Sequence, residues 1–182
     1  GSTPDPNPPQ VFERHIFLSP MSDIEGGANW LAVWKPLYDQ AKQSGLTGAT
    51  IVVSWYDIEP SPGTFTYTVL DQHVAYLKSL GLKYQILIDT SRDANPTLGG
   101  ALDYTDFYDD IQKKQDGSDS IYLGWRVHHS LSDAVSNTLA AAFVQAVCTH
   151  LSADIADNTC IAVGFRFGDN GEFCFSGTPS DY

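Results

Sequence analysis

Short apolar runs rich in β-branched residues alternate along this chain with longer stretches in which apolar residues recur at helical spacing. The short runs predict strands and the longer stretches predict helices. We expect strands at residues 15–19, 49–55, 83–89 and 160–167, and helices at residues 35–45, 70–81 and 132–151. Strands that alternate with helices in this order form a parallel sheet with crossover helices.

Two architectures with a parallel sheet fit this order, an open doubly wound sheet and a barrel. A dinucleotide-binding doubly wound sheet carries a Gly-rich turn after its first strand. Residues 22–27 read SDIEGG and contain no G-x-G-x-x-G pattern, which disfavours nucleotide binding. Residues 90–131 form a long connection after the third predicted strand. Connections of that length at the carboxyl ends of strands usually carry function.

The last predicted strand separates small from bulky side chains, because alternate residues of a strand point to opposite faces. One face carries Ala162, Gly164 and Arg166, and the other is bulky and apolar. The bulky face is expected to pack on helices, and the small face is typical of a barrel interior. An arginine buried there needs an acidic partner. Asp89, which ends the third predicted strand, is the partner we expect.

Composition narrows the class of ligand. The 182 residues include 10 Lys and Arg against 22 Asp and Glu, for a formal charge of −12. A polyphosphate backbone would be repelled, so a nucleic-acid partner is not expected. No apolar run approaches the ~18 residues that a transmembrane segment needs. Aromatic residues make up 12 % of the chain, and an acidic, aromatic-rich chain suits a neutral polyhydroxylated ligand such as a sugar.

The stretch that follows the second predicted strand is distinctive. Residues 54–65 read SWYDIEPSPGTF, which resembles the S-W-x-x-x-E-P-x-x-G-x-[FY] stretch of glycoside hydrolases of the β-galactosidase type. Leu70-Asp71, Gly81-Leu82-Lys83 and Asp116-Gly117 match further parts of the pattern. In that family the fourth strand runs into an Asn-Glu pair, and here Asn170-Gly171-Glu172 is one residue longer. This Gly-Glu is also similar to the β-amylase pattern.

The resemblance covers residues 15–176 and implies an α/β fold. Parallel βα units would form the first half, about four strands, of a (β/α)8 barrel. It also implies hydrolysis of O-glycosyl bonds in an oligo- or polysaccharide, with Glu172 as the general acid/base. The second carboxylate would lie outside this chain, and the stereochemical outcome, retaining or inverting, stays open. The alternative is a non-catalytic carbohydrate-binding or pseudo-enzyme half-barrel module.

Other residues are expected to bind substrate because they lie beyond the ends of predicted strands or in the long connection. They are Asp23, Trp55, Asp89, Arg92, Trp125, His128 and Asn170. Trp55 would offer a stacking face to a pyranose ring, and Asn170 would hydrogen-bond a sugar hydroxyl. Glu59 is expected to tie down its own loop. No metal or cofactor is expected, because His128 and His129 are adjacent and no H-x-x-x-H or C-x-x-C spacing occurs.

The two ends of the chain differ from its middle. Residues 1–12 are a Pro-rich linker that begins with Gly-Ser, typical of an expression scar, and residues 13–182 are the expected partial glycosidase domain. A Pro-rich stub of this kind often follows a removed signal or a lipoprotein anchor, which indicates a secreted or cell-surface protein. Residues 176–182 read as the middle of a loop. We therefore expect a second polypeptide, or self-association, to complete the barrel.

Three cysteines leave the redox state open. Cys148 could pair with Cys160 if the long helix ends early, or with Cys174 if the last loop folds back. Cys160 and Cys174 bracket a strand of roughly 20 Å, which is beyond the reach of a disulfide.

Overall fold

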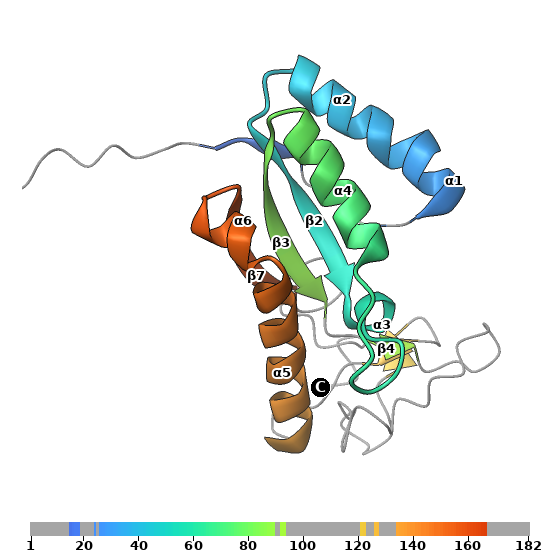
Figure 1. Cartoon of the computed structure of the whole chain (residues 1–182). Helices are drawn as coiled ribbons and strands as arrows, with labels where there is room; N and C mark the ends of the chain where they lie inside the picture. The colour runs from blue at the N-terminus through green and yellow to red at the C-terminus, as the bar shows by residue number, and fades with distance from the viewer. Residues whose placement is uncertain are drawn as a thin grey trace, which may run out of the picture.

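A four-stranded parallel sheet lies at the centre of the fold (Figure 1). The computed structural model describes residues 15–18, 24, 26–89, 92–93, 121–122, 126–127 and 134–166. The strands are β1 (Phe17–Leu18), β2 (Gly48–Ser54), β3 (Lys83–Asp89) and β7 (Cys160–Arg166). Their order in the sheet, β1-β2-β3-β7, is their order along the chain, and each neighbouring pair is parallel. The predicted strands are thus confirmed, and β3 has the expected bounds.

Helices fill the connections between these strands. They are α1 (Gly27–Asn29), the π-helix η1 (Trp30–Trp34), α2 (Lys35–Gln43), α3 (Trp55–Ile58), α4 (Thr68–Ser79), α5 (Ala134–His150) and α6 (Ser152–Ala156). The connection from β3 to β7 also contains a small antiparallel sheet of order β4-β6-β5. Its strands are β4 (Arg92–Asp93), β5 (Ile121–Tyr122) and β6 (Arg126–Val127).

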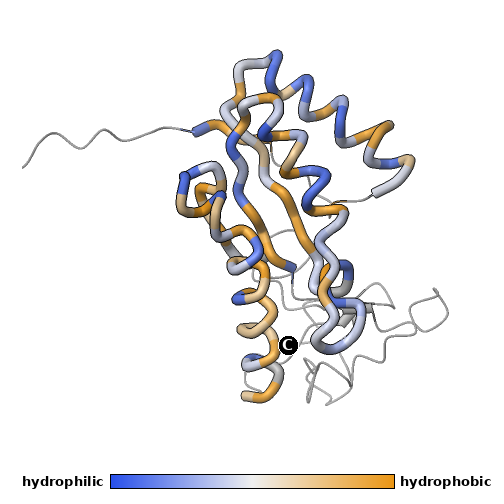
Figure 2. Tube along the Cα trace, in the orientation of Figure 1, coloured by the Kyte–Doolittle hydropathy of each residue, from blue (hydrophilic) through white to orange (hydrophobic). Residues whose placement is uncertain are grey.

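One hydrophobic core joins the helices to a single face of the sheet. Alternate residues of β2 and β3 point into it, and β2 is hydrophobic along most of its length (Figure 2). The core residues of the two strands are Ala49, Ile51, Val53, Tyr84, Ile86 and Ile88. The helices α2, α4 and α5 supply Tyr38, Leu70, Leu77, Phe143 and Val147 to the same cluster. Burying each large apolar side chain is worth ~1.5–3 kcal/mol.

This arrangement decides between the two architectures that the sequence allowed. A doubly wound sheet has helices on both faces and reverses its strand order at a switch point. Here the strands keep chain order, and α2, α4 and α5 contribute to one cluster on one face. These are the features of a (β/α)8 barrel, in which helices form an outer layer. The described sheet therefore has the form of half a barrel, as predicted.

The first crossover helix has an unexpected start. The regular helix α2 begins at Lys35, as predicted, but the chain is already helical from Gly27. Residues Trp30–Trp34 form a π-turn, and the N–H of Lys35 donates to the carbonyl of Trp30. Pro36 has no N–H and its ring crowds the preceding turn of an α-helix. The wider π-turn allows the chain to stay helical on both sides of this proline.

The long helix α5 has the predicted place in the chain, but one predicted option for its cysteine is wrong. Phe143 and Val147 are buried, whereas Val135, at the same helical spacing, is 51 % exposed. The helix continues through His150 and does not end early. Cys148 and Cys160 are both free thiols, so the predicted option of a bridge between them is wrong. Cys174 lies outside the described residues.

Candidate functional site

The carboxyl ends of three strands lie in register. Ser54, the last residue of β2, is paired with Asp89, the last residue of β3, and Asp89 is paired with Arg166, the last residue of β7. Ser54 is 4 % exposed and Asp89 is fully buried. The expectation that Asp89 and Arg166 would be neighbours is therefore met at the level of the backbone.

Ser54 and Asp89 are on the face of the sheet that points away from the helices. They have the same parity as Thr50 and Gln85, and Gln85 Nε2 donates to Thr50 Oγ1 over 2.7 Å. A buried polar row of this kind is stable only when its members are hydrogen-bonded. The carboxylate of Asp89 can accept hydrogen bonds from the N–H groups of a cationic side chain or from sugar hydroxyls. The candidate site consists of Ser54, Asp89 and Arg166, the last residues of three neighbouring strands. We call these three residues the strand-end row.

Trp55, the residue after β2, is turned to the opposite side. It shares the parity of Ile51 and Val53, and its indole is 1 % exposed and stacks on Phe143 of α5, with ring centroids 5.4 Å apart. This contact anchors the start of α3 to the helix layer. Sugar stacking by Trp55 stays a prediction, and the parity of β2 is the sequence signal for its packing role.

Glu59 connects Trp55 to the loop that follows. The indole Nε1 of Trp55 donates to Glu59 Oε2 over 2.6 Å, and the backbone N–H of Gly63 donates to Glu59 Oε1 over 2.7 Å. Gly63 has φ of +72°, which favours glycine. The Trp, Glu and Gly of the family-like stretch therefore hold one another in place, and the predicted structural role of Glu59 is confirmed. We call these three residues the Trp-Glu-Gly clamp.

The structure locates only some of the other predicted site residues. Arg92 is in β4, where its backbone pairs with Val127 of β6. The remaining ones lie outside the described residues: Asp23, Trp125, His128, Asn170 and Glu172. Across the described ranges, no group of three His, Cys, Asp or Glu side chains could hold a metal ion. No helix in that part of the chain is long and apolar enough to cross a membrane.

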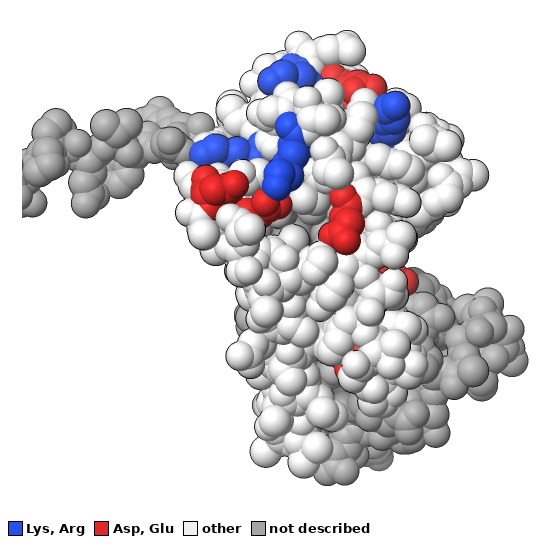
Figure 3. Space-filling view, in the orientation of Figure 1, with Lys and Arg blue, Asp and Glu red and all other residues white. Residues whose placement is uncertain are grey.

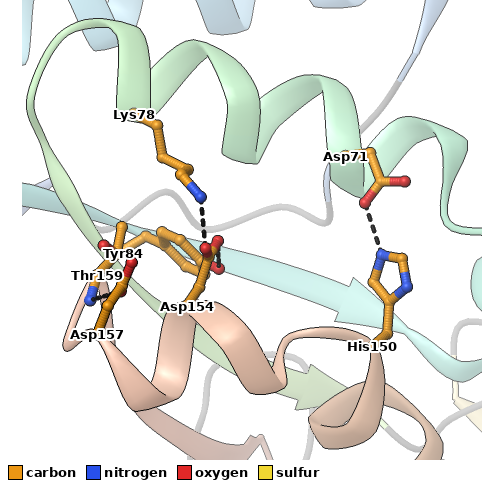
Figure 4. A network of polar contacts seen from close by, with 7 residues as sticks. All are labelled: Asp71, Lys78, Tyr84, His150, Asp154, Asp157 and Thr159. Carbon is orange, nitrogen blue, oxygen red and sulfur yellow. Dashed lines mark hydrogen bonds and ion pairs between the residues drawn. The ribbon is translucent and has the colours of Figure 1, made fainter.

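Two polar contacts that sequence reasoning missed join the crossover helices (Figure 4). His150 Nε2 at the end of α5 lies 2.6 Å from Asp71 Oδ1 on α4. Asp154 of α6 pairs with Lys78 and also accepts a 2.7 Å hydrogen bond from the hydroxyl of Tyr84. Burial, followed by the hydrogen bond to Asp154, raises the pKa of Tyr84 well above its usual range. No local sequence pattern predicts contacts between residues so far apart in the chain.

Most of the chain is similar to a known protein family. A family model described as beta-galactosidase, glycoside hydrolase family 42, matches residues 28–158. The chain belongs to this beta-galactosidase family. The match includes the Trp-Glu-Gly clamp, the parallel strands β2 and β3, and the crossover helices α2, α4 and α5. The resemblance predicted from residues 54–65 is thereby confirmed.

Solved structures of glycosidases are similar to this beta-galactosidase-family chain at low identity. An exo-beta-1,4-mannosidase, Op5Man5 from Opitutaceae bacterium strain TAV5, is 17 % identical with a TM-score of 0.42 over 75 % of this chain and 22 % of its own. GH5_18 from Bifidobacterium longum subsp. longum ATCC 55813 is 13 % identical with a TM-score of 0.40 over 78 % of this chain and 30 % of its own. The chain thus spans less than a third of either. A comparison with curated proteins gives no match.

Proposed function

We propose that this half barrel is part of an enzyme that hydrolyses O-glycosyl bonds of an oligo- or polysaccharide, with Glu172 as general acid/base. The family match over residues 28–158 is the observation that carries the proposal. Barrel enzymes place their catalytic groups just beyond the carboxyl ends of the strands. Glu172 follows the last residue of β7, Arg166, by only a few positions in the sequence.

In this proposal Glu172 protonates the oxygen of the leaving group, which needs a carboxyl group that is still protonated near neutral pH. Asp89 and Asn170 would bind hydroxyl groups of the sugar. Glycoside hydrolysis needs a second carboxylate, as nucleophile or as base. A sheet of four strands is half of what a (β/α)8 barrel contains. We infer that further βα units, in the same or a second polypeptide, supply that carboxylate. The Pro-rich residues 1–12 support a secreted or cell-surface location.

The test is the Glu172→Gln variant of the whole protein, assayed on a series of aryl glycosides whose leaving groups differ in pKa. Removal of a general acid is expected to lower kcat/KM by about 10²–10⁴-fold. The loss should be largest for phenols of high pKa and smallest for dinitrophenol, because a good leaving group departs without a proton. Glu13→Gln, which makes the same change of charge ahead of the first strand, is the matched control and should keep full activity.

Each outcome decides between the two functions. A loss that grows with leaving-group pKa supports Glu172 as the acid. Near-full turnover by Glu172→Gln would reject this role. Saccharide binding without turnover by the unchanged protein would reject the enzyme and favour a carbohydrate-binding module.

A further inference from the structure

A groove of about 470 Å³ lies between the start of α4 and the outer side of α5. It is on the helix side of the sheet, whereas the strand-end row is on the other side. It is lined by Tyr67, Ala142, Gln145, Ala146, Thr149 and His150. We call this the α5 groove. None of these lining residues belongs to residues 54–65 or to the strand-end row.

Three nearly parallel rings lie beside this groove. The rings of Tyr67 and His150 are stacked with centroids 3.7 Å apart, and the ring of Phe65 is stacked with that of Tyr67 at a centroid distance of 6.2 Å. Phe65 is 37 % exposed. His150 is held in place by its 2.6 Å contact with Asp71 (Figure 4). The aromatic wall is therefore fixed before any ligand arrives, which lowers the entropic cost of binding.

Two polar groups of the groove form no hydrogen bond within the described part of the chain. They are the hydroxyl of Tyr67 and the side-chain amide of Gln145. The Thr149 hydroxyl donates to the carbonyl of Gln145 over 2.7 Å, which leaves its own oxygen as an acceptor. The groove thus offers donors and acceptors next to the methyl groups of Ala142 and Ala146. Small-molecule sites combine apolar walls with a few polar groups in this way.

The charge of the surroundings restricts the ligand. The 17 residues of α5 include no Asp, Glu, Lys or Arg. The surface over α5 is correspondingly free of charged colour in Figure 3, while charges gather near the opposite end of α4. Asp71 and the formal charge of −12 disfavour an anionic ligand. A hydroxyl-rich ring with apolar C–H faces fits this neutral, half-aromatic surface.

We propose that the α5 groove binds a neutral saccharide segment at a distance from the strand-end row. The choice of a saccharide rests on the proposed function, because a polymer substrate would be long enough to reach a second site. Tyr67 and Gln145 would hydrogen-bond its hydroxyls, and Phe65 and the two alanines would contact its apolar faces.

The test is affinity electrophoresis of the full chain through gels that contain soluble galactan, mannan or xylan, with polygalacturonate as the anionic polymer. It is run in the Glu172→Gln background so that hydrolysis of the polymer is slowed during the run. The Tyr67→Phe variant removes one hydroxyl and keeps the ring stack, and Gln145→Ala removes one exposed amide. Combined in one protein, the two substitutions should weaken retardation by a neutral polymer about thirtyfold, which corresponds to two hydrogen bonds of ~1 kcal/mol each. Gln40→Ala, at an exposed position of α2, is the matched control and should behave as the parent.

The proposal is overturned if no neutral polymer retards the parent, if the Tyr67 and Gln145 variants are retarded as strongly as the parent, or if polygalacturonate retards the parent equally. Thermal unfolding of both variants checks that they fold. The proposed function fails separately, when the protein with Glu172 intact hydrolyses no glycoside. If retardation still depends on Tyr67 and Gln145 in that case, saccharide binding by the α5 groove stands without the proposed enzyme activity.

Discussion

Trp55 donates its indole N–H to Glu59 over 2.6 Å, and both residues belong to the stretch by which the family was predicted. The contact explains the spacing of that stretch, since four residues are one turn of α3. The second oxygen of Glu59 accepts the N–H of Gly63 and so closes the loop that follows. The family-like pattern is therefore, at these three positions, a requirement of folding.

The first prediction concerns this clamp. Glu59 is 8 % exposed and its carboxyl oxygens accept two hydrogen bonds, so Glu59→Ala leaves two donors without their acceptor. We expect a loss of about 3 kcal/mol in the free energy of unfolding, measured by urea denaturation. Glu59→Gln should lose less, because its amide keeps one acceptor. An unchanged urea midpoint for Glu59→Ala would contradict the clamp.

The second prediction concerns Gly48, where β2 passes closest to its neighbours. A Cβ at this position would overlap the ring of Phe17 and the carbonyl oxygen of Lys83. Because a backbone oxygen cannot turn aside, Gly48→Ala should lower the free energy of unfolding by about 3 kcal/mol. Gly164→Ala is the control, since its Cβ would meet only Leu87 Cδ2 at 3.4 Å. Equal thermal midpoints for the two variants would refute the distinction.

The third prediction separates two partners of Asp154. Asp154 is 9 % exposed and accepts the hydroxyl of fully buried Tyr84, whereas its other partner, Lys78, is 44 % exposed at its side chain. Asp154→Ala should therefore lower the free energy of unfolding by about 2 kcal/mol. Lys78→Met should lower it by less than about 1 kcal/mol, because an exposed ion pair contributes little. Chemical denaturation measures both free energies of unfolding. A larger loss in Lys78→Met than in Asp154→Ala would contradict this prediction.

The fourth prediction concerns alkaline pH. Burial raises the pKa of the Cys160 thiol from 9.0 to about 11, and burial also raises the pKa of Tyr38 and Tyr84. The folded state then holds these protons at pH values where the unfolded state has released them. Stability from this source is fully present below pH 9 and is lost as the pH rises through about 11.

Urea midpoints measured from pH 7 to pH 11 should show this fall. In Cys160→Ala the decline should begin at higher pH, where the phenols titrate, than in the parent protein. Midpoints that stay constant up to pH 11 would mean that these groups have the same pKa in both states.

The strands were predictable because their signal is local. Lys83–Asp89 alternates in burial over most of its length, which is the pattern that a strand with one face on helices imposes on its sequence. The alternation of β2, extended by one residue, also places Trp55 on the side of the helix layer. The position of a residue after a strand does not by itself give the direction of its side chain.

Other features could not be predicted because they depend on distant residues. Asp71 was noticed in the sequence as part of a Leu-Asp pair, but its contact with His150 exists only once α4 and α5 lie side by side. The π-turn before Pro36 likewise depends on tertiary packing, which favours a helix here although the proline disfavours a regular α-helical turn. The disulfide option failed because α5 continues to His150.

The strand order has a consequence for how the chain acquires its structure. Every strand of the parallel sheet lies beside the strand that precedes it in the chain. During synthesis, each new strand can therefore pair with the edge of a strand that has already left the ribosome. The β1–β2 and β2–β3 pairings span short stretches of sequence, whereas β7 must join β3 across the longest one. Contacts between residues distant in sequence form more slowly. Docking of β7 is therefore the step most exposed to delay during synthesis, and the edge of β3 is the surface that a chaperone would have to protect.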